Sequence, residues 1–227
     1  YPGIKTSYFR FDERSQSDWD YAIVVNRYIS PYKLKNKLWP PGNVIHIVYA
    51  DSVPLCGVLE RGPKNDFYGY EALNQGKIKD ATGFFEQALK ENDKDEMIFF
   101  NFASALIKDG QVAKADSVLK EGLKINPECD MILMYLGNLS KSREKPGEAK
   151  AYYKKLISVN RKYFDAYVEL SRLIVSDDVV RSRELLRTCL KMNPHFKPAI
   201  IALADTYRKS DPEVAEKYDQ LAKKIEN

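Results

Sequence analysis

The sequence of 227 residues has few of the features that mark several common protein classes. It contains two histidines and only three cysteines, Cys56, Cys129 and Cys189, which are far apart and include no CxxC pair. Such a set fits neither a disulfide framework nor a zinc site. Unbroken apolar runs such as Tyr21–Val25 are far shorter than the roughly 20 residues that cross a bilayer. We therefore expect no metal ion, no cofactor and no insertion of this chain into a membrane.

A large excess of one charge is also lacking. The chain has 36 Lys and Arg against 32 Asp and Glu, a net charge of +4. Residues 1–62 carry 8 basic and 6 acidic residues, which leaves 28 and 26 for the rest. A nucleic-acid-binding protein concentrates its positive charge in a stripe or patch, so we expect no nucleic-acid partner. With 44% apolar and 30% charged residues, the chain should be folded and globular.

Groups suited to catalysis are few. His46 lies in an alternating stretch typical of a half-exposed strand, and His195 lies in a turn between helices. There is no GxSxG-type nucleophile turn and no glycine-rich phosphate loop. Four acidic residues near the N-terminus suit helix capping better than a cation site; they are Asp12, Glu13, Asp18 and Asp20. We expect that the chain is not an enzyme.

What the sequence does contain is a repeat of 34 residues. Two small residues recur at this spacing, and a large apolar residue follows the second by four positions. The first small residue is Gly69, Ala103, Gly137 and Ser171; the second is Ala81, Ala115 and Ala149, with Ser182 one residue early. The large residue is Phe85, Leu119, Tyr153 and Leu186. Small residues let two helices approach closely, so this pattern predicts helix pairs that stack on one another.

The repeat predicts five helix pairs, over residues 66–92, 96–125, 130–159, 164–191 and 197–226. They correspond to repeats of about 64–95, 96–129, 130–163, 164–195 and 196–227. The turn "KSDPEV" before the second helix of the last pair is shorter than the family pattern. That helix has a single apolar stripe, which suits the solvent-facing end of a repeat array.

This pattern resembles the tetratricopeptide repeat family, whose unit is a helix-turn-helix of 34 residues. The stretches "NQGKIKDATGFFEQAL" and "KDGQVAKADSVLKEGL" carry the resemblance, as do Pro127 and Pro194 near the ends of two units. It extends over about residues 64–227. The resemblance implies an all-α fold, a TPR-type α-α superhelix, and a role in binding other proteins.

Residues 1–62 do not repeat, and we expect them to form a small α/β N-terminal cap. The runs "VIHIVYA" and "VPLCGVLER" flank Asp51-Ser52 and predict a β-hairpin. The stretch "DWDYAIVVNRYI" predicts either a helix or a buried strand. Ser30-Pro31 predicts the start of a short helix through "YKLKNKLW". The expected domains are thus a cap over 1–62 that packs on the first helix pair, and a solenoid over 63–227.

The segment over residues 8–61, which includes "FRFDERSQSDWDY", also resembles the soluble tail of bacterial membrane glycosyltransferase-like proteins. That resemblance implies an accessory domain whose catalytic part lies outside this chain. The chain begins at Tyr1 rather than at a methionine, so we expect that a segment upstream was removed. On this basis we expect a periplasmic location, with a cytoplasmic one left open.

In the tetratricopeptide repeat family, the first helix of each pair lines a concave groove. Carried over to this chain, the groove consists of Tyr70, Met97, Phe100, Ser104, Met131, Met134, Asn138, Val168, Arg172, Ile201, Asp205 and Arg208. Its methionines and apolar residues predict a protein or peptide partner with an apolar or amphipathic segment. The alternative is that these apolar side chains are half-buried between helices. Family members that clamp a C-terminal carboxylate use Lys and Asn where this chain has Asp66 and Tyr70, which argues against such a ligand.

Overall fold

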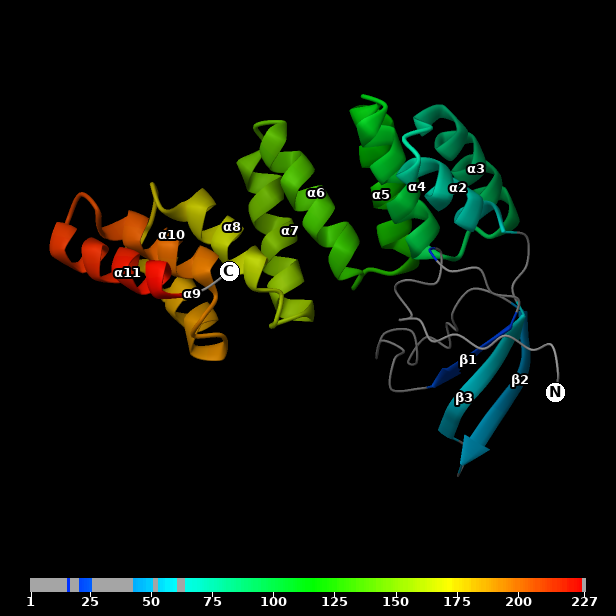
Figure 1. Cartoon of the computed structure of the whole chain (residues 1–227), viewed down its shortest axis with the longest axis horizontal. Helices are drawn as coiled ribbons and strands as arrows, with labels where there is room; N and C mark the ends of the chain where they lie inside the picture. Colours follow the sequence, from blue (N-terminus) through cyan, green and yellow to red (C-terminus); the bar gives the residue numbers. More distant parts are fainter. Residues whose placement is uncertain (1–15, 17–20, 26–42, 51–52, 61–63, 226–227) are drawn as a thin grey trace. The chain divides into compact units, whose positions relative to one another are not determined.

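The computed structural model describes residue 16 and residues 21–25, 43–50, 53–60 and 64–225 (Figure 1). Ten helices lie within residues 64–225: α2 (Asn65–Asn74), α3 (Ile78–Glu91), α4 (Glu96–Lys108), α5 (Val112–Ile125), α6 (Asp130–Ser142), α7 (Pro146–Val159), α8 (Phe164–Ile174), α9 (Val179–Met192), α10 (Lys197–Tyr207) and α11 (Pro212–Lys224). They form five consecutive pairs. Every boundary of the predicted pairs is confirmed to within two residues.

The helix ends follow from local chemistry. The Asp95, Asp178 and Asp211 carboxylates each accept a hydrogen bond from a backbone N–H of the first turn of α4, α9 and α11. The turns after α2 and α4 contain Gly76 (φ 73°) and Gly110 (φ 79°), in the left-handed region that glycine adopts without a steric cost. The Asp211 cap, followed by Pro212, favours the start of α11 after the shortened turn.

Close contact between a small and a large residue holds each pair together. A Cβ atom added to Gly137 of α6 would overlap Cε1 of Tyr153 on α7. A Cβ added to Gly69 of α2 would lie 2.8 Å from Cε1 of Phe85 on α3. Tyr153 and Phe85 are both fully buried. The repeated small residues therefore have the packing role that their spacing predicted.

Asparagines at the ends of the second helices add a polar connection that sequence reasoning missed. Asn126, after α5, donates to the Glu96 carboxylate of α4 (3.4 Å), and Asn160, after α7, donates to Asp130 of α6 (3.0 Å). Each asparagine also accepts from the backbone N–H two residues further on. Each thereby ties the end of its second helix to the start of the first helix in the same pair.

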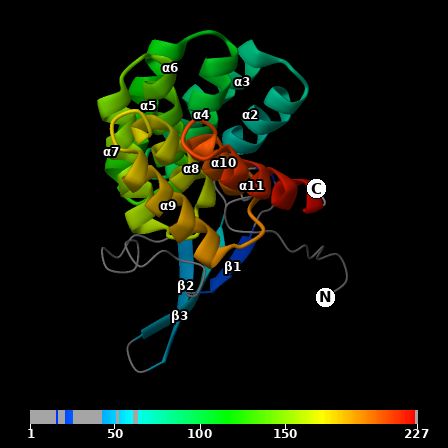
Figure 2. The same cartoon turned by 90° about the vertical axis from the view of Figure 1, so that its left-hand side faces the viewer.

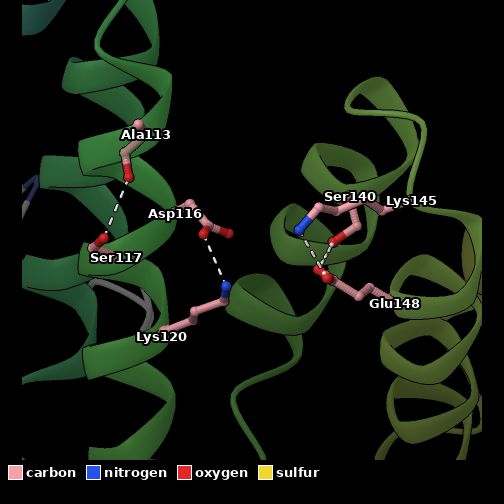
Figure 3. Close-up of polar contacts among 7 residues, drawn as sticks. All are labelled: Ala113, Asp116, Ser117, Lys120, Ser140, Lys145 and Glu148. Atoms are coloured by element: carbon pink, nitrogen blue, oxygen red, sulfur yellow. Dashed lines mark hydrogen bonds and ion pairs between the residues drawn. The ribbon is translucent and has the colours of Figure 1, made fainter.

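Glu148 makes a second connection within the α6–α7 pair (Figure 3). Its carboxylate accepts from the buried Ser140 hydroxyl of α6 (3.4 Å) and from Lys145 in the turn (2.9 Å). Because Ser140 is only 2% exposed, this bond satisfies a polar group that packing has removed from water.

The N-terminal part contains a three-stranded antiparallel sheet of strand order β1-β3-β2, with β1 (Tyr21–Val25), β2 (Asn43–Ala50) and β3 (Val53–Glu60) (Figure 1). The predicted hairpin of β2 and β3 is confirmed. Of the two alternatives for the first run, the strand is correct, but Tyr21 and Ile23 are 62% and 73% exposed rather than buried. His46 is an exposed residue of β2. The predicted helix after Ser30-Pro31 and the acidic group near the N-terminus lie outside the described residues.

The chain divides into two compact units, Tyr1–Cys129 and Asp130–Asn227. The first contains the sheet and helices α2–α5, and the second contains α6–α11; α10 and α11 lie side by side in Figure 2. The core of the second unit forms around Tyr167, Leu186 and Leu203.

None of the described helices is long and apolar enough to cross a membrane. A separate cap over 1–62 stays a prediction.

The first helix pair shows what such a cap would cover. Tyr68 and Phe84 are 48% and 37% exposed, and their ring centroids are 5.9 Å apart. An exposed aromatic surface at the end of a repeat array favours aggregation unless something covers it. We therefore expect a chain that begins at Gly62 to melt about 2–8 °C below the full chain, a loss of about 1–2 kcal/mol. Calorimetry and light scattering measure this, and equal melting and solubility of the two chains would contradict it.

The small–large contact makes a second prediction. Gly137→Ala places a methyl group against the Tyr153 ring and should destabilise the fold by about 1–3 kcal/mol, the cost of overpacking a core. Gly83→Ala is the matched control, because Gly83 lies inside α3 with no atom near its added Cβ. The control should gain about 0.5–1 kcal/mol from helix propensity. Urea unfolding gives the free energy of unfolding of both variants. A Gly137→Ala chain as stable as the Gly83→Ala control would contradict the close packing of Gly137 against Tyr153.

Candidate partner-binding surface

The twelve predicted groove residues lie on the first helices of the pairs or directly after them. Tyr70 of α2 and Met97, Phe100 and Ser104 of α4 belong to the first unit. The other eight belong to α6, α8 and α10 of the second unit, and Arg208 directly follows α10. The predicted set is thus divided between two units, and each part is described by itself.

In the first unit, the predicted residues are mostly withdrawn from solvent. Met97 is only 4% exposed, and its backbone N–H donates to the Asp95 carboxylate that caps α4 (2.9 Å). Tyr70, Phe100 and Ser104 are half-buried. A ligand contact for these residues stays a prediction.

In the second unit, the predicted residues range from buried to exposed. Val168 is only 2% exposed, and Met134 packs against the buried cluster that contains Tyr153 and Leu170. Met131 is half-buried. The exposed members are Asn138, Arg172, Ile201, Asp205 and Arg208. The accessible part of this surface is therefore polar, with Ile201, at 37% exposed, as its apolar member.

The Asn138 carboxamide of α6 is held in a fixed orientation. The hydroxyl of Tyr153, on α7, donates to Asn138 Oδ1 (2.7 Å). Burial and, secondly, the Glu169 carboxylate raise the pKa of Tyr153 well above its usual value, so its hydroxyl keeps the proton that it donates. The Nδ2 group of Asn138 has no hydrogen-bond partner among the described residues and is directed by this bond to donate elsewhere.

Two basic side chains near Asn138 share one acidic partner. Glu169 of α8 accepts an ion pair from Lys141 of α6 and another from Arg172 of its own helix (3.0 Å). The Glu169 side chain is 14% exposed, so this shared carboxylate is largely shielded from water. An acidic ligand would have to compete with Glu169 for both cations. The two cations and their shared carboxylate keep one net positive charge.

Arg208 at the end of α10 is also paired. It forms an ion pair with Asp205 (2.8 Å) and a two-pronged one with Asp219 of α11 (2.7 and 3.1 Å). The hydrogen bonds from Arg208 lower the pKa of Asp219, which keeps this carboxylate charged. The geometry gives Arg208 a role in joining α10 to α11.

Two arginines of α9 hold the same end of α10. The Arg183 guanidinium lies 3.7 Å from the ring centroid of Tyr207 and donates to the Thr206 carbonyl (2.6 Å). Arg187 donates to the Tyr207 hydroxyl (2.6 Å). These contacts join the C-terminal end of α10 to α9.

Sequence reasoning missed Tyr153 and Glu169 as parts of this surface. The repeat identified Tyr153 only as a core residue, and nothing in the sequence marks Glu169 as the acid that pairs with Lys141. The described residues contain no group of three or more His, Cys, Asp or Glu side chains placed to hold a metal ion.

Comparisons with known proteins agree with the repeat. The tetratricopeptide repeat model matches residues 98–129 and 132–163. A MamA protein crystal structure has a TM-score of 0.60 and 19% identity over 68% of this chain and 85% of its own. MamA (41-end) from Desulfovibrio magneticus RS-1 has a TM-score of 0.62 and 17% identity over 72% and 96%. YrrB, described as a TPR protein with an unusual peptide-binding site, has a TM-score of 0.57 and 15% identity over 70% and 83%.

These matches show the fold. The chain contains tetratricopeptide repeats and has the helical-repeat fold of TPR proteins. No curated protein matches the sequence. None of the matches supports the resemblance of residues 8–61 to the tail of glycosyltransferase-like proteins.

The Tyr153 hydroxyl gives a testable dependence of stability on pH. Its pKa in the folded chain is raised above the unfolded value near 10, so the folded state retains a proton that the unfolded state releases. The resulting stability is fully present below about pH 10 and is lost as the pH rises further. We expect the unfolding free energy of Tyr153→Phe to fall less than that of the unchanged chain between neutral pH and about pH 11. Parallel curves from urea unfolding would contradict this expectation.

Proposed function

We propose that this chain is a non-enzymatic scaffold that binds a protein or peptide segment on the first helices of its repeats. The part with the best-defined geometry is the surface of α6, α8 and α10 in the second unit. The observation that carries the proposal is the Asn138 carboxamide, whose Oδ1 is occupied by Tyr153 while its Nδ2 is available. A fixed side-chain amide of this kind suits a main-chain carbonyl of a bound peptide, whatever the peptide's sequence.

The charges of the surface indicate which ligand it accepts. Glu169 pairs with both Lys141 and Arg172, and Arg208 pairs with both Asp205 and Asp219, so the six groups together carry no net charge. A peptide rich in acidic or basic residues would have to break these pairs and leave one partner uncompensated. The surface therefore favours a segment with few charges on the side that touches it.

The apolar residues supply the other half of the interaction. Ile201 is 37% exposed on α10, and Met131 and Met134 of α6 are half-buried with flexible side chains. Methionine adapts to ligands of different shape, and an exposed isoleucine gains free energy when a ligand covers it. We propose an apolar or amphipathic segment as the ligand.

The fold supports this interpretation. TPR-type proteins are generally scaffolds for other proteins, and YrrB, which shares the fold, is described as having a peptide-binding site.

The test uses peptides selected from a random library by the unchanged chain. Asn138→Ala removes the donor, and Ile201→Glu places a charge on the apolar contact. Each should weaken the selected peptides by about 1–3 kcal/mol, the range for an interface anchor, which is about 5–150-fold in Kd. Ile201→Glu is a cleaner change than Met134→Glu, because Met134 also packs against the core.

Met192→Glu is the matched control, since Met192 is 41% exposed and lies at the end of α9, a second helix. It should leave the affinity unchanged. Circular dichroism establishes that all three variants keep their helix content. Peptides that bind the Asn138 and Ile201 variants as tightly as the unchanged chain would place the binding surface elsewhere.

A further inference from the structure

Positive charge gathers on α7 and on the turn after it. Between Lys145 and Lys162 the chain has six basic residues and one acidic residue. The second unit as a whole has 19 basic and 14 acidic residues, whereas the first has 17 and 18. The net charge of +4 therefore arises in the second unit. When the sequence is instead divided at residue 62, the two parts have nearly equal net charges, and this difference is not seen.

Two of the six cations are neutralised within the chain. Lys145 pairs with Glu148 (2.9 Å; Figure 3), and Lys150 pairs with Asp177 (2.8 Å). The other four are exposed and form no ion pair with any residue that the structure describes. We call them the α7 basic patch: Lys154, Lys155, Arg161 and Lys162.

The second helices of the first unit balance their lysines in two ways. In α5 every lysine is paired: Lys114 with Glu86 (2.5 Å), Lys120 with Asp116 (2.8 Å; Figure 3) and Lys124 with Glu121 (2.7 Å). Residues 77–94, on α3 and its flanking turns, also have four exposed lysines without an ion pair among the described residues, but four acidic residues accompany them. Like charges that crowd together without counter-charges repel one another. Residues 145–162 differ from residues 77–94 in their local excess of positive charge, six basic residues against one acidic residue, which an external anion would balance.

The residue types in the patch indicate what kind of anion it takes. Three of the four are lysines, which act as point charges on flexible stems, whereas a shaped carboxylate or phosphate pocket uses the planar fork of arginine. The patch lies on a helix surface and a turn. No exposed aromatic side chain lies between residues 145 and 163, so bases of a nucleic acid strand would have nothing to stack on. A broad anionic surface fits these features best.

We propose that the α7 basic patch binds the surface of a membrane that contains anionic lipids. Clusters of four to eight Lys and Arg bind such surfaces through their charge alone. No helix enters the bilayer in this mode, in keeping with the described helices, none of which could span it. The patch belongs to α7 and the turn after it, whereas the proposed peptide surface belongs to α6, α8 and α10, so this proposal does not rest on peptide binding.

The experiment measures co-sedimentation of the full chain with phosphatidylcholine vesicles that contain or lack phosphatidylserine. The test variant changes all four patch residues to glutamine. The control variant changes Lys77, Lys79, Lys90 and Lys94 of the first unit to glutamine. These four lysines are also exposed, and their replacement lowers the net charge of the chain by the same amount. Circular dichroism and the affinity of a selected peptide are measured on each variant, so that a loss of folding or of the proposed function is distinguished from a loss of membrane binding.

We expect the unchanged chain to bind only the phosphatidylserine vesicles and to be released by high salt. Each cation contributes about fivefold to such binding, so the test variant should lose at least about a hundredfold and the control far less. Failure of the unchanged chain to bind at low salt would overturn the proposal, and so would an equal loss in both variants. Binding to duplex DNA that depends on the patch, without binding to vesicles, would assign the patch to nucleic acid instead.

Discussion

The contact between Gly137 and Tyr153 is the constraint on which the best-defined part of the molecule depends. With no side chain on Gly137, α6 and α7 come close enough for the Tyr153 ring to fill the space between them. The same ring carries the hydroxyl that orients Asn138. The Tyr153 side chain therefore has two roles. Its ring is packed in the core, and its hydroxyl orients the Asn138 amide at the surface. A repeat with an aliphatic residue here, such as Leu119 or Leu186, packs in the same way but has no hydroxyl to present.

The distribution of ion pairs gives the two faces of the second unit different properties. On the first helices, carboxylates such as Glu169 and Asp205 form ion pairs with the neighbouring cations, which leaves a surface suited to a weakly charged ligand. On α7 and the turn after it, the four patch cations have no such partner among the described residues. Exposed ion pairs add little to stability, so the energetic importance of this arrangement lies in which partners it admits. A neutral surface and a charged one on different helices let one chain contact two partners of different chemistry.

The helix pairs could be predicted to within two residues because the repeat is a packing rule expressed in sequence. A small residue opposite a large one can be identified without a structure, since both recur every 34 residues. The hairpin could be predicted because its β-branched runs flank a short turn. The strand Tyr21–Val25 could not be distinguished from a helix, because a run of five apolar residues satisfies either period.

The candidate surface could be predicted only in outline. Val168 and Ile201 occupy the same position in successive repeats, yet Val168 is 2% exposed and Ile201 37%. The difference arises because α10 packs against α8, whereas no further repeat follows α10 and α11 among the described residues. Polar pairs that join different elements, such as Asn126 with Glu96 or Lys141 with Glu169, depend on side-chain geometry that a periodic pattern does not contain.

The central claim is that the first helices of the second unit bind a peptide through the amide that Tyr153 holds in place. Its most direct test is the NMR signal of the Asn138 side-chain NH₂ group during titration with a selected peptide. We expect a downfield shift of one of its two protons, together with changes in the backbone amides of α6, α8 and α10 that are larger than those on α7, α9 and α11. The claim would be contradicted if the Asn138 signal stayed unchanged while the backbone amide signals of α7, α9 and α11 shifted.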